Sequence, residues 1–316
     1  MRSWKLTIIS ILFLLTLTAL WSQAQDNTVA QQQEDLRQLG QTALDGSLTD
    51  LNKDIQEEIY ADSGMLDLLI VKDFKTRMFL SLFNDLEYHS NANFDDGDGE
   101  GSFVHDIAIQ FYTTTNMPNE TFTIDTLTRV NNLIYEGVDE QNRWGVFNRI
   151  YGTYHPEYKW IPDVFFGPEV FRYQSWDTGK RTSASIGPTI GVSDYFTLNS
   201  KTNTGIYYLY KYNARFYQPG EFDHHSNLVN IGIRQFFFEN KLMIEPYYSF
   251  YVYDYMHSNR LDLQHYAGIN VSYRFSDEFT AKLGFTWTNN ESSLADNEAD
   301  YEDYSGGMTT SLTYRF

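Results

Sequence analysis

The chain has 316 residues, a formal net charge of −19 at pH 7 and no cysteine. The lack of cysteine excludes disulfide bonds, thiolate metal sites and a lipid-modified cysteine at the N-terminus of the mature protein. The acidic balance excludes the basic surface with which proteins bind nucleic acid, so we expect no nucleic-acid partner. Aromatic residues make up 17% of the chain although the mean hydropathy is only −0.45.

The first 24 residues have the pattern of a secretory signal peptide. Arg2 and Lys5 form a basic start, Leu6–Leu20 is apolar, and Ser22-Gln-Ala24 offers small residues at a cleavage site. The apolar run is short for a helix that spans a membrane. We therefore expect residues 1–24 to be removed after Ala24; an uncleaved anchor helix is the alternative.

Residues 25–74 differ in composition from the rest of the chain. They are rich in Gln, Glu and Asp, and Leu51, Ile55 and Ile59 recur at helical spacing. A further apolar run covers Met65–Val71. We expect a short acidic, helical segment that is either an extension or a small plug of the domain that follows. A partly ordered tail remains the other interpretation.

From about Lys75 to the last residue, apolar and polar residues alternate with a period of two, which is typical of strands with one apolar and one polar face. In the first of these segments, Phe79 and Phe83 depart from the alternation. Further strands are expected near residues 102–113, 143–155, 163–174, 181–193, 204–218, 226–238, 241–254, 261–275, 278–289 and 306–316. Residues 117–141 indicate a long loop, a strand near Val130–Glu136, or both.

After Leu20 no apolar run is long enough for a membrane helix, so a membrane domain would have to be a closed β-barrel. Tight polar turns, such as Phe238–Lys241 and Phe275–Glu278, alternate with longer connections, as they do in such barrels. The chain ends on an amphipathic strand, Met308–Phe316, which resembles the C-terminal strand of outer-membrane barrels in Gram-negative bacteria. The resemblance implies that Tyr314 and Phe316 form the signal that the barrel assembly machinery reads.

These observations predict an all-β protein whose residues 75–316 form a transmembrane, antiparallel, up-and-down β-barrel of about twelve strands; ten strands remain possible. A soluble β-sandwich would show the same alternation and is the alternative fold. The expected location is the outer membrane of a Gram-negative bacterium, with residues 25–74 in the periplasm. The expected partners are outer-membrane lipid, the barrel assembly machinery and small solutes.

Charged residues on the polar face of the strands form the main candidate site. They would face the bore of the barrel, where they could tune a narrow passive channel for small solutes. The alternative is that they pair with one another and fill a closed bore. The predicted bore-lining residues are Arg77, Asp85, Glu87, Asp106, Lys211, Arg215, Arg234, Lys241, Glu245, Asp262, Arg274, Lys282 and Arg315.

A second candidate site is the segment His224-His-Ser226-Asn. It resembles the active-site segment of outer-membrane phospholipase A and of barrel lipid A deacylases. The resemblance implies a lipid acyl hydrolase with His224 as base, Ser226 as nucleophile and Asn230 as the residue that orients the histidine. However, the three residues share the polar face of a regular strand, which places them inside the barrel, unless a β-bulge reverses the face.

Two acidic runs, Asp95–Glu100 and Asp296–Asp303, are expected to be solvated loops. The first matches a calcium loop only in part, because position twelve is Ile107. We expect no metal site and no cofactor, apart from loosely held divalent cations at these loops. A third function remains open beside the channel and the hydrolase, namely a structural or assembly-partner barrel that docks through residues 25–74.

Overall fold

The computed structural model describes residues 75–91, 101–117, 121–136, 142–156, 158, 161–175, 181–199, 204–218, 220–238, 240–293 and 300–316. The expected signal peptide, the segment 25–74 and the acidic run Asp95–Glu100 lie outside the described residues. The predictions made for them therefore stay predictions.

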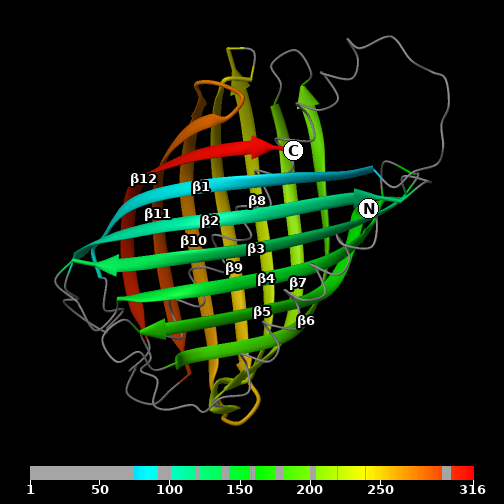
Figure 1. Ribbon diagram of the computed structural model, residues 1–316. Helices are drawn as coiled ribbons and strands as arrows, with labels where there is room; N and C mark the ends of the chain where they lie inside the picture. The colour runs from blue at the N-terminus through cyan, green and yellow to red at the C-terminus, as the bar shows by residue number, and fades with distance from the viewer. Residues whose placement is uncertain are drawn as a thin grey trace.

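Within the described residues, twelve antiparallel strands form one closed barrel in chain order (Figure 1). A short 3-10 turn, η2 (Gly220–Phe222), precedes the eighth strand. The strands are β1 (Lys75–His89), β2 (Ser102–Asn116), β3 (Phe122–Tyr135), β4 (Arg143–Tyr154), β5 (Asp163–Ser175), β6 (Arg181–Asn199), β7 (Thr204–Gln218), β8 (His224–Phe237), β9 (Leu242–Tyr255), β10 (Leu261–Arg274), β11 (Phe279–Ser292) and β12 (Tyr301–Arg315). The prediction of an all-β barrel of about twelve strands is confirmed.

The barrel closes where β1 pairs with β12, from Phe79 opposite Arg315 to His89 opposite Ser305. Because β1 also pairs with β2 along its whole length, no edge strand remains at this seam. In Figure 1 the strands of the front wall cross those of the back wall steeply, as expected when the strands of a closed barrel tilt against its axis.

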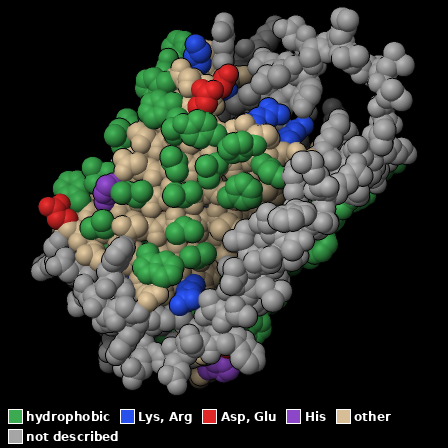
Figure 2. Space-filling view, in the orientation of Figure 1, with side chains coloured by type: hydrophobic (Ala, Val, Ile, Leu, Met, Phe, Trp, Pro, Cys, Tyr) green, Lys and Arg blue, Asp and Glu red, His purple; other side chains and the backbone are tan. Residues whose placement is uncertain are grey.

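The two faces of the wall differ in chemistry. Apolar side chains point outward and are exposed, for example Phe103, Ile107 and Ile109, with 48%, 46% and 52% of their surface accessible. Figure 2 shows hydrophobic side chains spread over one outer face, with charged side chains mostly near its borders. The alternate residues of the same strands, such as Asp106 and Gln110 of β2, are buried on the inner side. We call the space that the wall encloses the bore.

Both ends of the described chain lie at the same end of the barrel, since β1 begins there and β12 ends there. The tight turns β8–β9 and β10–β11 lie at this end as well. In the first of them Asn240 has a φ of 64°, a left-handed conformation that asparagine tolerates well. Among the described residues no helix is long and apolar enough to cross a membrane.

Two features differ from the sequence-based expectation. The uncertain segment 117–141 contains a full strand, β3, and the last strand begins at Tyr301 rather than near residue 306. The acidic run that ends at Asp303 indicated a loop, but Asp303 faces the bore and is only 2% exposed. It is stable there because His89 of β1 lies opposite and contacts it.

Asp303 connects the two strands of the seam at its loop end. Its carboxylate lies 2.7 Å from His89 Nδ1, and it accepts hydrogen bonds from Ser90 Oγ at 3.1 Å and from the Asn91 backbone N–H at 3.0 Å. His89 is also 2% exposed. A buried carboxylate with three partners stabilises closure, since its loss leaves buried donors without an acceptor.

We predict that Asp303→Ala lowers the free energy of unfolding by about 3 kcal/mol, because three donors lose their shared acceptor. Urea unfolding in detergent micelles, followed by tryptophan fluorescence, measures the change. The exposed Glu291, which contacts only Asn289 among the hydrogen bonds described, provides the matched control Glu291→Ala. Equal stability of the two variants would contradict a role for Asp303 at the seam.

Candidate functional site

The predicted bore-lining residues fall into three groups by position. Six are buried on the inner face of the wall: Asp106, Lys211, Arg215, Arg234, Glu245 and Asp262. Five more occupy inward positions of their strands and are partly buried: Arg77, Asp85, Glu87, Arg274 and Lys282. Lys241 is exposed in the β8–β9 turn, and Arg315 is exposed at the end of β12.

Glu169 of β5 is the centre of the largest charged cluster. Its carboxylate accepts hydrogen bonds from Lys211 Nζ at 3.3 Å and from an Arg215 guanidinium nitrogen at 2.5 Å. The hydroxyl of Tyr151 and the amide of Asn213 donate to it as well. Glu169 is 2% exposed, and these donors explain how a carboxylate can remain charged at a buried position.

Two more buried ion pairs join neighbouring strands of the wall. Arg129 of β3 donates to Asp106 of the neighbouring β2 at 3.0 Å. Arg234 of β8 donates to Glu245 of the neighbouring β9 at 2.6 Å. The two cations around Glu169 come from β7, two strands away. These pairs hold charged side chains against the inner surface of the wall.

Three buried charged residues of the inner face were not predicted. Glu169, Arg129 and Asp303 were absent from the predicted set although all three are buried on the inner face. Glu169 follows Phe165-Phe166-Gly-Pro, where apolar residues occupy both faces of the strand and hide the alternation. Arg129 lies in the segment 117–141, for which a long loop, a strand near Val130–Glu136, or both were expected. A strand assignment over 122–135 would have placed Arg129 on the bore side.

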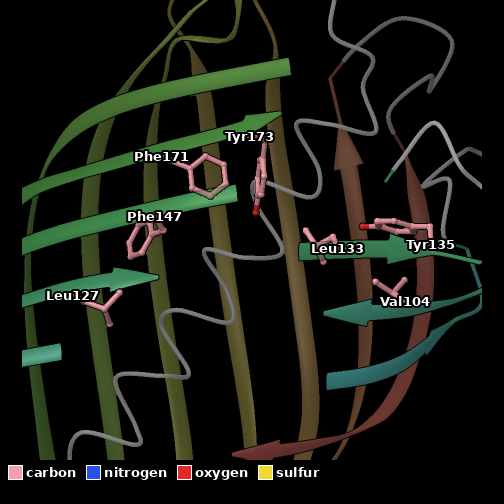
Figure 3. Close-up of a cluster of buried hydrophobic side chains, with 7 residues drawn as sticks. All are labelled: Val104, Leu127, Leu133, Tyr135, Phe147, Phe171 and Tyr173. Carbon is pink, nitrogen blue, oxygen red and sulfur yellow. The ribbon is translucent and has the colours of Figure 1, made fainter. Parts of the chain in front are cut away.

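Part of the inner face is apolar. Seven side chains of β2–β5 form a buried cluster on the bore side (Figure 3): Val104, Leu127, Leu133, Tyr135, Phe147, Phe171 and Tyr173. A second cluster, on β8–β10, consists mainly of tyrosines. In it the rings of Tyr251 and Tyr253 lie parallel with their centroids 5.6 Å apart. The bore is therefore lined by charged, aromatic and apolar sectors.

The residues of the predicted hydrolase site all face the bore. His224, Ser226 and Asn230 are 2%, 8% and 2% exposed, on alternate positions of a regular β8. His224 Nδ1 donates to the Phe222 carbonyl at 3.0 Å, while Nε2 has no hydrogen-bond partner among the described residues. The pairing of β8 with β7 shows no register shift, so the bulge that would turn Ser226 toward the outside is not present.

Within the described parts of the chain, no group of three or more His, Cys, Asp or Glu side chains could hold a metal ion. The acidic run Asp296–Asp303 is described only from residue 300 onward. In that part, Asp300 accepts a hydrogen bond from the backbone N–H of Ser292, and Asp303 contacts His89. Both carboxylates thus serve as acceptors for neighbouring strands.

No protein-family model matches the chain, and no curated protein sequence is similar to it. Its fold is similar to that of an outer membrane channel from Pseudomonas putida F1, with a TM-score of 0.47 and 7% identity over 80% of this chain and 99% of that one. It is also similar to the outer membrane channel DcaP of Acinetobacter baumannii (TM-score 0.43, 9% identity, 79% and 100% covered). The translocator domain of NalP from Neisseria meningitidis gives a TM-score of 0.38 with 11% identity over 84% and 97%. These likenesses are too loose to assign a solute or an activity.

We predict that Glu169→Gln destabilises the barrel by about 4 kcal/mol, because two buried cations lose their counter-charge. The shift of the thermal unfolding midpoint in detergent measures this loss. Glu278→Gln, at an exposed position of the β10–β11 turn, is the control with the same chemical change. If both variants unfold at the temperature of the natural protein, Glu169 does not hold the cluster together.

We also predict that Ser226→Ala leaves hydrolysis of phospholipid unchanged, because the Ser226 hydroxyl faces the bore and His224 Nε2 makes no hydrogen bond to it. Release of fatty acid from mixed micelles, compared between the variant and the natural protein, is the measurement. A loss of activity in the variant would restore the hydrolase hypothesis.

Proposed function

We propose that the protein is a narrow passive channel for small solutes in the outer membrane of a Gram-negative bacterium. The observation that carries this proposal is the opposite chemistry of the two faces of one closed wall. Exposed apolar side chains cover the outside, while ion pairs such as Arg234–Glu245 are buried inside. Lipid favours the first face, and a polar path across the membrane requires the second.

The proposed orientation follows from the connections. In outer-membrane barrels the short turns face the periplasm and the longer loops face outward. The tight β8–β9 and β10–β11 turns lie at the end where β1 begins and β12 ends, so this end would be periplasmic. Residues 25–74 would then join the barrel from the periplasm. Tyr314 and Phe316 would lie where the periplasmic assembly machinery can bind them.

The proposed solutes are small because the bore is partly occupied by its own side chains. Barrels of eight strands are filled by side chains, whereas barrels of sixteen strands leave an aqueous channel, and twelve strands lie between these cases. Fixed charges along a narrow path determine which ions enter. Lys282 and Arg274 contribute positive charge at inward positions near the periplasmic end, and Asp85 contributes negative charge farther along β1. The interior position of Ser226 favours this function over lipid hydrolysis.

The protein purified from outer membranes should produce discrete current steps in a planar lipid bilayer. Lys282→Glu should shift the permeability ratio toward cations by about twofold, because it reverses one charge beside the path in a screened, largely aqueous bore. The reversal potential under a salt gradient measures this ratio.

Lys241→Glu supplies the matched control, since Lys241 is exposed in the β8–β9 turn at the end of the barrel, beyond the strands. Its reversal potential should equal that of the natural protein. A folded preparation that stays silent at every applied voltage contradicts the channel. Equal shifts in both variants would show that surface charge, rather than the bore, sets selectivity.

A further inference from the structure

Arg149 of β4 is a half-buried cation on the inner face whose guanidinium forms no ion pair with the described residues. In the sheet it lies directly opposite Glu169 of β5 on one side and opposite Leu127 of β3 on the other. Its guanidinium carbon lies over the ring of Tyr151, 5.3 Å from the ring centroid. Its Nε has no hydrogen-bond partner in the described parts of the chain. Arg149 therefore has donors to offer to a ligand in the bore.

Glu169 does not neutralise Arg149, because other donors already occupy its carboxylate. A carboxylate offers about four lone-pair sites to donors. Four side chains of β4 and β7 donate to this one: Tyr151, Lys211, Asn213 and Arg215. Arg149 interacts with Glu169 and Lys211 electrostatically, without a hydrogen bond to either.

The cluster therefore has an excess of positive charge. Three cations surround the one carboxylate of Glu169, namely Arg149, Lys211 and Arg215. Asp125 of β3 accepts hydrogen bonds from two hydroxyl groups and forms no ion pair with the described residues. One positive charge remains even when Asp125 is included in the balance. An additional anion would thus be attracted to this part of the wall.

The cluster lies halfway along the barrel. Glu169 is the central residue of β5, and Lys211 is the central residue of β7. Tyr251 of β9 lies in the same cross-strand row as Lys211, with Leu228 of β8 between them. Because neighbouring strands are about 4.8 Å apart, the Cα atoms of Lys211 and Tyr251 are about 10 Å apart. A solute that follows the bore would pass this level.

Tyr251 has a hydroxyl without a hydrogen-bond partner among the described residues, although its side chain is only 2% exposed. Its ring is parallel to that of Tyr253 and meets Tyr266 edge-on, with both centroid distances 5.6 Å. It lies close enough to Glu169 and Arg215 to interact electrostatically with both. A buried hydroxyl without a partner is unfavourable, so Tyr251 also has a donor to offer at this level.

We propose that Arg149 and Lys211 bind a small oxyanion, a carboxylate or phosphate group, halfway along the bore. The proposal rests on the proposed function, because it names the class of solute that the channel would select. Two parallel N–H groups of a guanidinium match two oxygens of such a group. Lys211 donates one of its three ammonium N–H groups to Glu169, so others can bind the anion. The Tyr251 hydroxyl would donate, through a water molecule, to the side of the anion that faces the bore.

Block of the chloride current by inorganic phosphate tests the site in the full-length protein. Added phosphate should reduce the single-channel current in a planar bilayer, with a saturable dependence on its concentration. Arg149→Gln should raise the half-blocking concentration roughly tenfold, because charge-assisted hydrogen bonds to the anion are lost. Arg172→Gln makes the same chemical change on the outer face of β5 and should leave this concentration unchanged. Equal shifts in both variants, or no block of the natural protein, overturn the site.

Tyr251→Phe removes the hydroxyl and keeps the ring packing. It should raise the half-blocking concentration of phosphate roughly threefold, because one hydrogen bond to the hydrated anion is lost. Tyr248→Phe is the matched control on the outer face of the same strand, where the Tyr248 hydroxyl contacts His265. Equal values for the two variants overturn the role of Tyr251.

Isothermal titration calorimetry in detergent measures binding of phosphate without any conduction. Arg149→Gln should weaken the binding roughly tenfold, whereas Arg149→Lys keeps the charge and should weaken it only about threefold. Equal losses in both variants would show that a folding defect, rather than charge, is responsible, and would overturn the site. A parallel titration with acetate tells whether a carboxylate binds as phosphate does, and binding of either anion upholds the site.

The site and the channel function fail in different ways. If Arg149→Gln weakens the binding of phosphate but no preparation conducts, the anion site is upheld and the channel is overturned. If the protein conducts but phosphate and acetate neither block the current nor bind, the channel is upheld and the anion site is overturned.

Discussion

The structure depends on the closure of one sheet upon itself through the pairing of β1 with β12. Every strand then has a neighbour on both sides, so backbone N–H and C=O groups are satisfied within the wall. Only this condition allows side chains such as Ile109 to face an apolar solvent, since an open edge there would leave polar groups without partners. Closure also fixes which face of each strand is inside, and so it determines the chemistry of the bore.

Inside that wall, charged groups are stable because each meets its counter-charge locally. Glu169 has Lys211, Arg215 and Tyr151 as donors, and Arg234 has Glu245 on the adjacent strand. A buried charge without such partners would cost several kcal/mol, so the positions of these pairs are constrained by register. Because the pairs lie along the wall, their stability does not require contact across the bore. A lining of this kind is compatible with a path for solutes.

The sequence alone predicted the barrel best where the bore face is polar. In β7 and β10 the polar residues of the alternating pattern are mostly the buried, inward-facing ones. Lys211, Arg215 and Asp262 were therefore placed correctly on the inner face. Prediction was poorest in β3, because Leu127 and Leu133 are apolar and face the bore. Phe79 and Phe83 of β1 depart from the alternation for the same reason. With apolar residues on both faces, a period of two disappears, so β3 was not assigned a definite strand. Asp303 was expected in a loop because it ends an acidic run. Its partner His89 is more than 200 residues away in the sequence, so no local pattern indicates that this carboxylate is buried in a strand.

The apolar residues that concealed β3 also distinguish one sector of the inner wall from the rest. An apolar sector on the inner wall is unfavourable in a water-filled bore, and outer-membrane barrels normally have polar interiors. Selection for conduction alone would therefore not place Leu133, Phe147 and Phe171 in one buried cluster there. These side chains stay out of water by packing against one another, so this sector stabilises the wall. Polar and charged residues elsewhere in the bore would line the proposed path.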